Sequence, residues 1–337
     1  MTTITQDLDQ LHAISGTRRM SLAALTARIA CSALGLLGIL AATGAAYEQI
    51  AAAGDAKAYP APGRLVDVGG YRLHLDCRGE GSPTIVMDAG LGKSSLDWTL
   101  IQPQLAHTTK VCTYDRAGMG WSDPGPAPRT PSRIASELHV LLHNAGVAGP
   151  YLLVGHSLAG KNMRLFANDY PAEIAGMVLI DARSEVVEAN ADQPAFAAAL
   201  EAQATQYAVA RKLGIARLFG GSLVGLPQIS PALATQMALF ETGPSAIAAT
   251  TQEGLNRTAD DLTLARSDLG SMPLTVIAAG SNMTDPVWSA AQSSMAKLST
   301  KGRLVVAEGS GHAVHLEKPE IVIDAISGLV DEIRAPY

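Results

Sequence analysis

Ser157 stands at a point where the sequence changes abruptly from an apolar run, 151–154, to a helical pattern. Gly155 and Ala159, two residues to either side, are small enough for a tight strand-to-helix turn, in which larger side chains would collide with the neighbouring backbone. On such a turn the serine hydroxyl is exposed at the end of a sheet. The backbone N–H of Leu158 then lies at a helix N-terminus, where negative charge is stabilised. The spacing predicts a nucleophilic serine beside one donor for an oxyanion.

A serine hydroxyl is a weak nucleophile at neutral pH, so it needs a histidine to take its proton and a carboxylate to orient that histidine. Two histidines follow Ser157 in the chain, His312 and His315. His312 comes after the glycine-containing stretch 309–311, in a loop that can bring an imidazole back over the sheet. His315 leads into the last predicted helix. We expect His312 to be the base, with His315 as the alternative.

Unalternated apolar segments separated by helical patterns predict the elements that position these side chains. Continuous apolar strands between helices are typical of a parallel sheet that is covered on both faces. A hairpin around Gly69-Gly70 is predicted to precede them, because the flanking residues alternate between apolar and polar. The predicted strands are 64–68, 71–77, 84–88, 110–114, 151–154, 176–181, 274–278 and 303–307, and the predicted helices are 95–106, 131–145, 158–169, 287–298 and 319–333.

The alternation of strands and helices stops between residues 182 and 271, where the sequence has helical periodicity and no convincing strand. Loops at the carboxyl ends of parallel strands bind ligands, so we expect a helical cap over the Ser157 pocket. A separate helical domain without substrate contacts is the alternative. The predicted organisation is a cytoplasmic leader (1–28), an apolar segment (29–47), a linker (48–62), a core (63–181 and 272–337) and the cap (182–271).

In their order and spacing these motifs resemble those of esterase- and lipase-like serine hydrolases with the α/β-hydrolase fold. The resemblance runs from residue 64 to residue 333, and it is carried by the run 88–92 with Ser95 and Trp98, the run 114–123, the elbow around Ser157, and Gly311-His312. Many relatives have His-Gly where this chain has Ala89-Gly90, and the second glycine of the elbow is Ala159 here. Neither departure removes a catalytic atom. The resemblance implies an α/β fold with a mostly parallel central sheet, helices on both faces and a helical cap insertion.

The resemblance also implies where the acid of a Ser-His-Asp triad should lie. Asp285 comes seven residues after the predicted strand 274–278, which matches the place of the acid in the family pattern. We therefore expect Asp285 to be the acid. The loop before it is longer than usual, so Asp181, at the end of the preceding strand, is the fallback. Asp181 could instead cap the first turn of the helical insertion.

The second oxyanion donor should come from the loop after strand 84–88, and by position it is the backbone N–H of Leu91, which would join that of Leu158. Asp115 and Arg116 are expected to hold loops through buried hydrogen bonds and to take no part in the chemistry.

These residues predict a carboxylic ester hydrolase that uses Ser157, His312 and Asp285, forms an acyl-enzyme, and needs no metal or cofactor. A cap rich in Ala, Leu, Phe and Met favours a small or apolar substrate. Acyl transfer or cofactor-free perhydrolysis would use the same triad, and a non-catalytic ligand-binding homologue is the rival from another class. By the same resemblance, epoxide hydrolases and dehalogenases of this fold would have an aspartate at the elbow. Ser157 at that position therefore disfavours both reactions.

The start of the chain departs from a globular composition. Residues 29–47 carry no charge and follow Arg18, Arg19 and Arg28. About 20 apolar residues cross a bilayer, and arginines on the N-terminal side would keep that end in the cytoplasm. We expect a retained anchor with the catalytic domain in the periplasm or outside the cell. A cleaved signal, suggested by the small residues 43–46 and giving a secreted enzyme, and a soluble amphipathic leader are the alternatives.

The remaining composition narrows the partners. The 337 residues are 47% hydrophobic with a net charge of −6, and no basic run of the kind that nucleic acid requires is present. Cys77 and Cys112 lie in two predicted strands, where they could form a disulfide or remain buried thiols. His139 and His143 are four residues apart on a predicted helix but lack a third ligand, so we expect no metal there. The sequence leaves the oligomeric state open.

Overall fold

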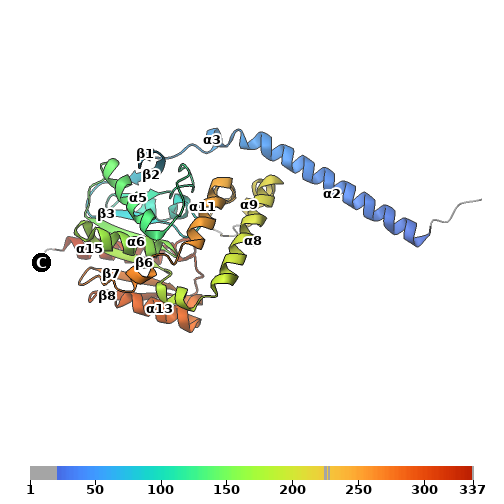
Figure 1. Ribbon diagram of the computed structural model, residues 1–337. Helices are drawn as coiled ribbons and strands as arrows, with labels where there is room; N and C mark the ends of the chain where they lie inside the picture. Colours follow the sequence, from blue (N-terminus) through green and yellow to red (C-terminus); the bar gives the residue numbers. More distant parts are fainter. Residues whose placement is uncertain (1–20, 224–225, 227, 336–337) are drawn as a thin grey trace, which may run out of the picture.

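A mostly parallel sheet forms the centre of the computed structural model, which describes residues 21–223, 226 and 228–335 (Figure 1). Within these residues the sheet has eight strands in the order β1-β2-β4-β3-β5-β6-β7-β8. The pairs β1/β2 and β2/β4 are antiparallel, and the other neighbours are parallel, as predicted. The strands are β1 (Arg64–Asp67), β2 (Arg72–Arg78), β3 (Thr84–Asp88), β4 (Val111–Tyr114), β5 (Tyr151–His156), β6 (Ile174–Ile180), β7 (Leu274–Ala279) and β8 (Gly302–Ala307).

The first two strands form the predicted hairpin. Gly69 and Gly70 connect them with φ values of +114° and +101°, in the left-handed region that favours glycine. Cys77 of β2 lies directly opposite Cys112 of β4, and the two are joined by a disulfide. The structure therefore has the disulfide and not the pair of buried thiols that the sequence also allowed.

Helices cover both faces of the sheet, which explains why every residue of β3, β5 and β7 is buried. The helices α5 (Pro131–Asn144), α6 (Ala159–Asp169) and α13 (Pro286–Ala296) contribute to the core on one face, and α4 (Gln102–Leu105) and α15 (Pro319–Arg334) to the core on the other. The helix predicted over 95–106 is instead two short pieces, η1 (Ser95–Trp98) and α4. Pro103 explains the break, because it lacks the N–H that a continuous helix would need.

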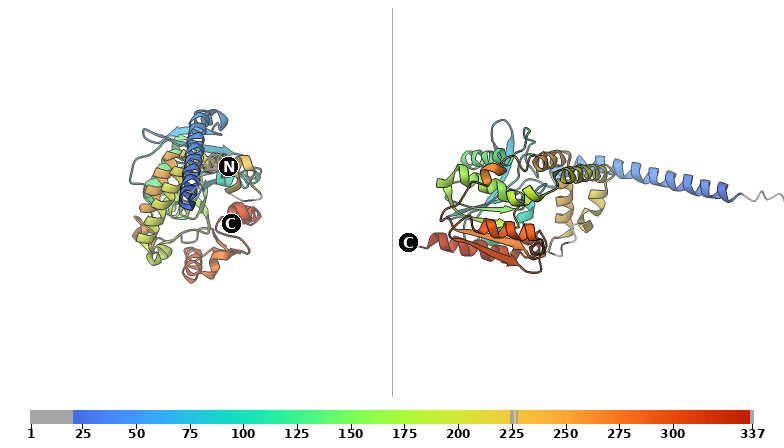
Figure 2. Two further views of the ribbon diagram at one scale, coloured as in Figure 1. Left: turned by 90° about the vertical axis from the view of Figure 1, so that its right-hand side faces the viewer. Right: turned by 60° about the horizontal axis from the view of Figure 1, so that its bottom comes forward.

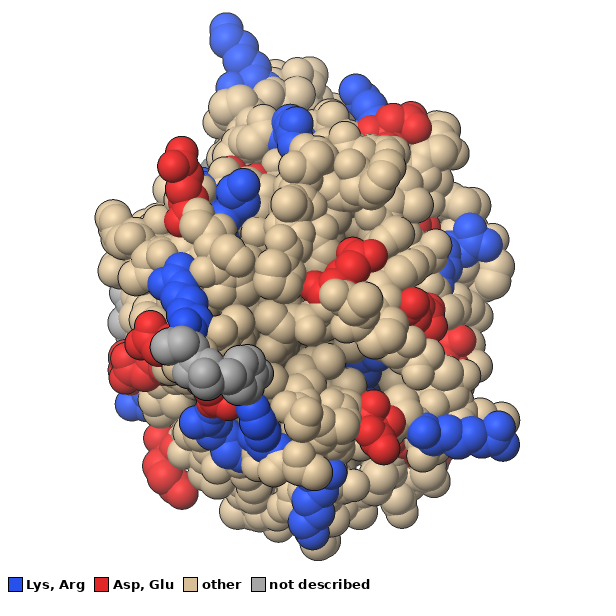
Figure 3. Space-filling model, turned by 90° about the vertical axis from the view of Figure 1, so that its left-hand side faces the viewer, with Lys and Arg blue, Asp and Glu red and all other residues tan. Residues whose placement is uncertain are grey.

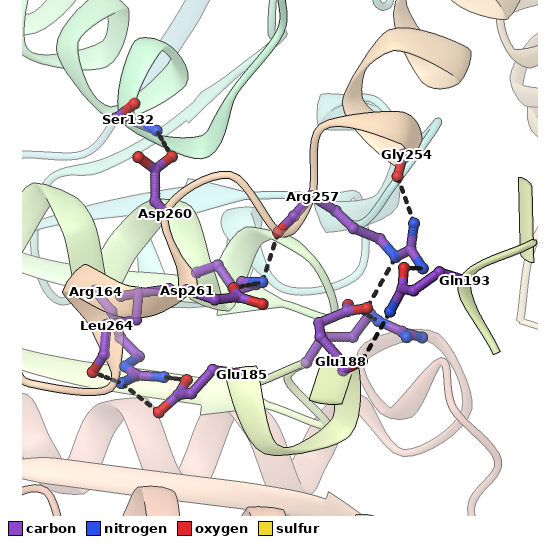
Figure 4. Close-up of polar contacts among 12 residues, drawn as sticks. Ser132, Arg164, Glu185, Glu188, Gln193, Gly254, Arg257, Asp260, Asp261 and Leu264 are labelled. Carbon is purple, nitrogen blue, oxygen red and sulfur yellow. Dashed lines mark hydrogen bonds and ion pairs between the residues drawn. The ribbon is translucent and has the colours of Figure 1, made fainter. Parts of the chain in front are cut away.

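The segment between β6 and β7 is helical in its described residues and contains no strand there. It comprises α7 (Glu185–Asn190), α8 (Gln193–Lys212), α9 (Ile215–Leu223), α10 (Pro231–Glu241), α11 (Pro244–Leu255) and α12 (Asp261–Leu264), which we call the helical insertion. Buried ion pairs fasten it, as Figure 4 shows: Arg164 of α6 pairs with Glu185 at 2.7 Å, and Arg257 pairs with Glu188 at 2.9 Å. The first pair fixes the insertion to α6, and the second joins α7 to the segment that follows α11.

A long helix, α2 (Leu22–Ala52), projects from the body of the molecule (Figures 1 and 2). Among the described residues it alone is long and apolar enough to cross a membrane. It contains the predicted apolar segment 29–47. Of the predicted leader, residues 1–20, with Arg18 and Arg19, lie outside the described residues.

The linker expected over 48–62 is not an irregular spacer. Helix α2 continues to Ala52, and α3 (Asp55–Ala58) follows. Glu48 and Asp55 each pair with both Arg211 and Arg217 of the helical insertion, at distances of 2.6–3.0 Å. These four ion pairs explain why the segment is held in place although its composition is that of a linker.

Among the described residues, three further short helices lie in the connections between strands and longer helices. They are η2 (Pro171–Glu173), η3 (Gly280–Thr284) and α14 (Val314–Glu317). The last of these follows the loop that carries His312, so this loop lies between β8 and α14.

Candidate active site

Ser157 occupies a sharp turn between β5 and α6. Its φ is +55°, a left-handed conformation that a non-glycine residue rarely adopts. Its N–H donates to the carbonyl of Ile180 at 3.0 Å, so the turn is held against the end of β6. A Cβ at Gly155 would lie 2.8 Å from the carbonyl oxygen of Ala159, which explains why the turn needs glycine there. The geometry is that of the elbow expected from the sequence.

His312 bridges Ser157 and a buried aspartate. Its Nε2 lies 2.9 Å from the hydroxyl oxygen of Ser157, and its Nδ1 lies 2.5 Å from Oδ2 of Asp181. These three residues come from the ends of β8, β5 and β6, which the sheet brings to one edge. Hydroxyl oxygen, imidazole and carboxylate thus form one chain of contacts, which we call the triad, and this is the arrangement that general-base activation of a serine requires.

Asp181 is held by donors on both carboxylate oxygens. Its Oδ1 accepts hydrogen bonds from the N–H of Ala279 at 3.0 Å and from the indole N–H of Trp288 at 2.8 Å. Its Oδ2 accepts one from the side-chain amide of Asn282 at 2.6 Å, in addition to its contact with His312. The residue is fully buried and has a φ of +40°. Its orientation toward the imidazole is therefore determined by the surrounding loop.

Asp285, the acid expected from the family pattern, does not meet His312 in the structure. Its Oδ1 accepts hydrogen bonds from the N–H groups of Val287 at 2.8 Å and Trp288 at 3.1 Å, which makes Asp285 the N-cap of α13. The fallback, Asp181, occupies the position of the acid instead. The sequence carried a signal for this outcome, because an aspartate directly before a proline is typical of an N-cap followed by the first helical residue.

The two expected oxyanion donors lie in backbone that surrounds Ser157. Leu158 is the N-cap of α6, so its N–H precedes the first helical turn. Leu91 lies in a turn over residues 90–93, which is closed by a 3.1 Å hydrogen bond from the last N–H to the first carbonyl. A Cβ added to Gly90 would lie 3.3 Å from the Cβ of Ser157, so this turn packs directly against the serine.

A buried guanidinium group fixes the turn that carries Leu91. Arg116 donates to the carbonyl oxygens of Ala89 at 2.6 Å and Gly90 at 2.8 Å. The same side chain pairs with Asp88 at 2.5 Å and with Glu253 of α11 at 2.9 Å. Arg116 therefore orients the backbone of the turn and links it to the helical insertion, in agreement with the loop-holding role expected for it.

Two further histidines lie beside the triad. His156 Nε2 contacts the carbonyl oxygen of His312 at 3.0 Å, and burial, together with His315 and His312, lowers the pKa of His156 well below its usual value. An uncharged His156 donates to that carbonyl and so positions the loop of His312. His315, the alternative base, is buried and contacts Asp97 at 3.3 Å. His156 was not among the residues predicted for the site, and its place next to Ser157 is the signal that could have indicated it.

A cavity of about 540 Å³ lies beside His312. Its walls include Tyr207 and Ala210 of α8, Ala216 of α9 and Met237 of α10, so the helical insertion forms one side of it. They are largely apolar. His156 and His312 are among its lining residues, so the cavity lies directly beside the imidazole that contacts Ser157.

The lining of this cavity also includes charged side chains, two of which, Lys93 and Glu241, form an ion pair. Lys93 Nζ lies 2.6 Å from Glu241 Oε1. Burial opposes the charge of Lys93, but the carboxylate of Glu241 raises the pKa of Lys93 above its usual value. The lysine charge is therefore already neutralised within the protein.

A family model described as the alpha/beta hydrolase fold matches residues 83–319, so the chain belongs to this family. It is 28% identical over 264 residues to the uncharacterized protein YqjL of Bacillus subtilis strain 168, a match that covers 77% of this chain and 88% of that protein. It is 37% identical over 129 residues to a probable transporter, efuK, of Hormonema carpetanum. That match covers 36% of this chain and only 18% of the transporter.

Solved structures have the same fold. A thermophilic esterase from Thermogutta terrifontis matches with a TM-score of 0.60 at 20% identity, covering 81% of this chain and 99% of the esterase. The epoxide hydrolase CorEH matches with a TM-score of 0.61 at 19% identity, covering 80% of this chain and 99% of that enzyme. At these identities the comparison establishes the α/β-hydrolase architecture and leaves the reaction to be argued from the site.

Proposed function

We propose that this protein is a serine hydrolase that cleaves carboxylic esters of small or apolar substrates. The observation that carries the proposal is the contact chain from Ser157 Oγ to His312 Nε2, at 2.9 Å, and from His312 Nδ1 to Asp181, at 2.5 Å. Both distances are within hydrogen-bond range, as general-base activation of a serine requires.

In the proposed reaction the hydroxyl oxygen of Ser157 attacks the ester carbonyl while His312 takes the hydroxyl proton. Asp181 stabilises the resulting imidazolium. The N–H groups of Leu91 and Leu158 hold the oxyanion, and each donor contributes about 3 kcal/mol to the stability of the transition state. His312 then protonates the leaving alcohol. In the second half, His312 takes a proton from water, the water oxygen attacks the acyl carbon, and the acid leaves as Ser157 recovers its proton.

The residue at the elbow separates this proposal from epoxide hydrolysis, although an epoxide hydrolase has the same fold. By the family resemblance, an epoxide hydrolase of this fold would use the carboxylate of an aspartate at the elbow as its nucleophile. This chain has Ser157 at that position, which cannot supply a carboxylate. Most of the exposed wall of the cavity is apolar, and its described charged residues are Lys93, already paired with Glu241, and the carboxylates of Asp97, Glu241 and Glu317. An anionic acyl or alcohol group would lose its hydration there and meet like charge, so the cavity favours an uncharged one.

We also propose that α2 anchors the protein in a membrane, with the catalytic domain outside the cytoplasm. Its length and apolar composition support a membrane span. The Cys77–Cys112 disulfide supports an oxidising compartment for the domain that follows.

The test uses the full chain purified in detergent, a fluorophosphonate probe and p-nitrophenyl esters of graded chain length. We expect one labelled serine and measurable ester turnover, both abolished by Ser157→Ala and both retained by Ser136→Ala, a change at an exposed position of α5. If the wild-type protein is neither labelled nor active, it is a non-catalytic binding protein. If ester products form only with an added alcohol or peroxide, the reaction is acyl transfer or perhydrolysis.

A further inference from the structure

Helix α2 has two parts with different surroundings. Every residue from Leu22 to Leu40 is exposed, whereas from Ala41 onward one side of the helix packs against the helical insertion. Gly44 marks this contact: a Cβ added to it would lie 2.3 Å from the carbonyl oxygen of Leu213, where α8 ends. The body of the protein therefore begins at the level of Gly44 along α2.

That level lies inside the uncharged segment of α2. The segment 29–47 spans about 28 Å at 1.5 Å per residue, close to the thickness of the hydrocarbon core of a bilayer. Gly44 is only three residues before its end. If α2 spans a bilayer, the junction between α8 and α9 lies at the boundary between the hydrocarbon and the head groups.

The residues at this junction are unusually apolar for a surface. Beyond α2, the described residues include seven exposed large hydrophobic side chains, and four of them lie between positions 209 and 219. We call these four the α9 patch: Val209 (49% exposed), Ile215 (38%), Leu218 (57%) and Phe219 (55%). Ile215, Leu218 and Phe219 have the i, i+3, i+4 spacing of one helix face. The other side of α9 carries Ala216, which is buried and lines the cavity beside His312.

The position of α9 in the molecule is suitable for a helix that lies on a membrane surface. In Figure 1 the helices α8 and α9 lie on the side of the molecule from which α2 projects. The face turned away from α2, shown in Figure 3, carries positive and negative side chains interspersed over its whole extent. The ion pairs of Glu48 and Asp55 with Arg211 and Arg217 prevent the insertion from turning away from α2.

We propose that the α9 patch lies in the surface of the bilayer crossed by α2, and that the cavity receives esters that partition into that bilayer. Amphipathic helices bury their apolar face about 5–10 Å into this region. Because α9 has the lipid on one side and the cavity on the other, an apolar ester needs to cross only the layer of the insertion helices to reach Ser157. The inference rests on the proposed esterase function and on α2 as a membrane span.

The position of the patch is measured with spin labels on the full chain in phosphatidylcholine nanodiscs. In a Cys31→Ser background, single variants Phe219→Cys and Leu262→Cys are labelled with a nitroxide. Leu262 is the control, since it is 77% exposed and lies on α12 near Asn168 at the far end of α6. We expect the label at 219 to be more accessible to oxygen than to a water-soluble nickel complex, and the label at 262 to show the reverse.

A label at 219 that behaves like the one at 262 would overturn the proposal. So would a label at 219 that is shielded from both relaxing agents and broadened by a second nitroxide, because the patch would then be an interface between two copies of the chain.

The route of the substrate is measured separately, with the double variant Leu218→Glu/Phe219→Glu and the control Leu262→Glu. We expect the double variant to lose at least fivefold in kcat/KM on a long-chain ester embedded in phosphatidylcholine vesicles and to keep full activity on p-nitrophenyl acetate in water. The control should keep both. Equal loss on both esters, or none on either, would contradict the route. A wild-type protein without any turnover would contradict the esterase proposal, while the spin labels would still report the position of the patch.

Discussion

The end of β6 and the loop after β7 each present an aspartate, and the two have opposite surroundings. Asp181 is fully buried and its carboxylate accepts hydrogen bonds from three side chains and one backbone N–H. Asp285 accepts only from the first N–H groups of α13, and both of these contacts are exposed. The comparison shows that the place of an aspartate shortly after a strand is not enough to bring its carboxylate to His312. The donors that converge on it decide whether it orients a histidine or begins a helix.

The largest effect should come from exchanging each carboxylate for its amide. Asp181→Asn keeps the shape of the side chain but removes the charge and the acceptor that fix the His312 tautomer. We expect kcat for a p-nitrophenyl ester to fall by roughly 10³–10⁴-fold. Asp285→Asn is the matched control, and steady-state kinetics should find its kcat within about threefold of wild type. A severe loss in Asp285→Asn together with an active Asp181→Asn would reverse the comparison and restore Asp285 as the acid.

A smaller effect should follow from removing one donor to Asp181. Trp288→Phe keeps an aromatic ring beside His312 but deletes the N–H that contacts Oδ1 at 2.8 Å. A hydrogen bond to a charged group contributes about 1.5–3 kcal/mol, so we expect kcat to fall by roughly 10- to 100-fold with KM little changed. Trp121→Phe deletes an indole N–H that donates to the carbonyl of Tyr59, away from the triad. Equal losses in both variants would mean that Trp288 acts through packing alone.

The smallest effect belongs to the capping role of Asp285. Asp285→Ala leaves two N–H groups of α13 without their acceptor and should lower the free energy of unfolding by about 1 kcal/mol. Thermal unfolding in detergent should then show a Tm lower by about 2 °C. Asp285→Ser keeps a capping oxygen and should recover most of the loss. An unchanged Tm in the alanine variant would show that the cap contributes nothing to stability.

Local patterns in the sequence were enough to predict the sheet and the elbow. The unalternated apolar segments became the buried parallel strands because each lies between helices. The small residues Gly155 and Ala159 marked Ser157 as a candidate, and the other motifs of the chain were needed to support it, because so short a string also occurs by chance. His312 could be selected because the two histidines after Ser157 lie in different local contexts. Each of these patterns depends on only a few neighbouring residues, and the structure agrees with what they predict.

The orientation of Asp181, by contrast, depends on contacts that no local pattern encodes, although the proline after Asp285 did mark Asp285 as a helix cap. Asp181 is oriented by Asn282 and Trp288, more than one hundred residues later in the chain. The same holds at the other end of the molecule, where Glu48 meets Arg211 and Arg217 across more than 160 positions. The segment 48–62 has the composition of a linker but is a fixed part of the fold, because Glu48 and Asp55 form ion pairs that could not be assigned from the sequence alone.

The contact between Glu48, Asp55 and the two arginines decides where the catalytic part of this protein can be cut free. A chain shortened to begin after Ala52 would keep every atom of the triad but would leave Arg211 and Arg217 to share the single carboxylate of Asp55. It would also uncover the backbone of Leu213 that now packs on Gly44. A soluble version suited to crystallisation should therefore retain the last turns of α2 and replace only its free outer length.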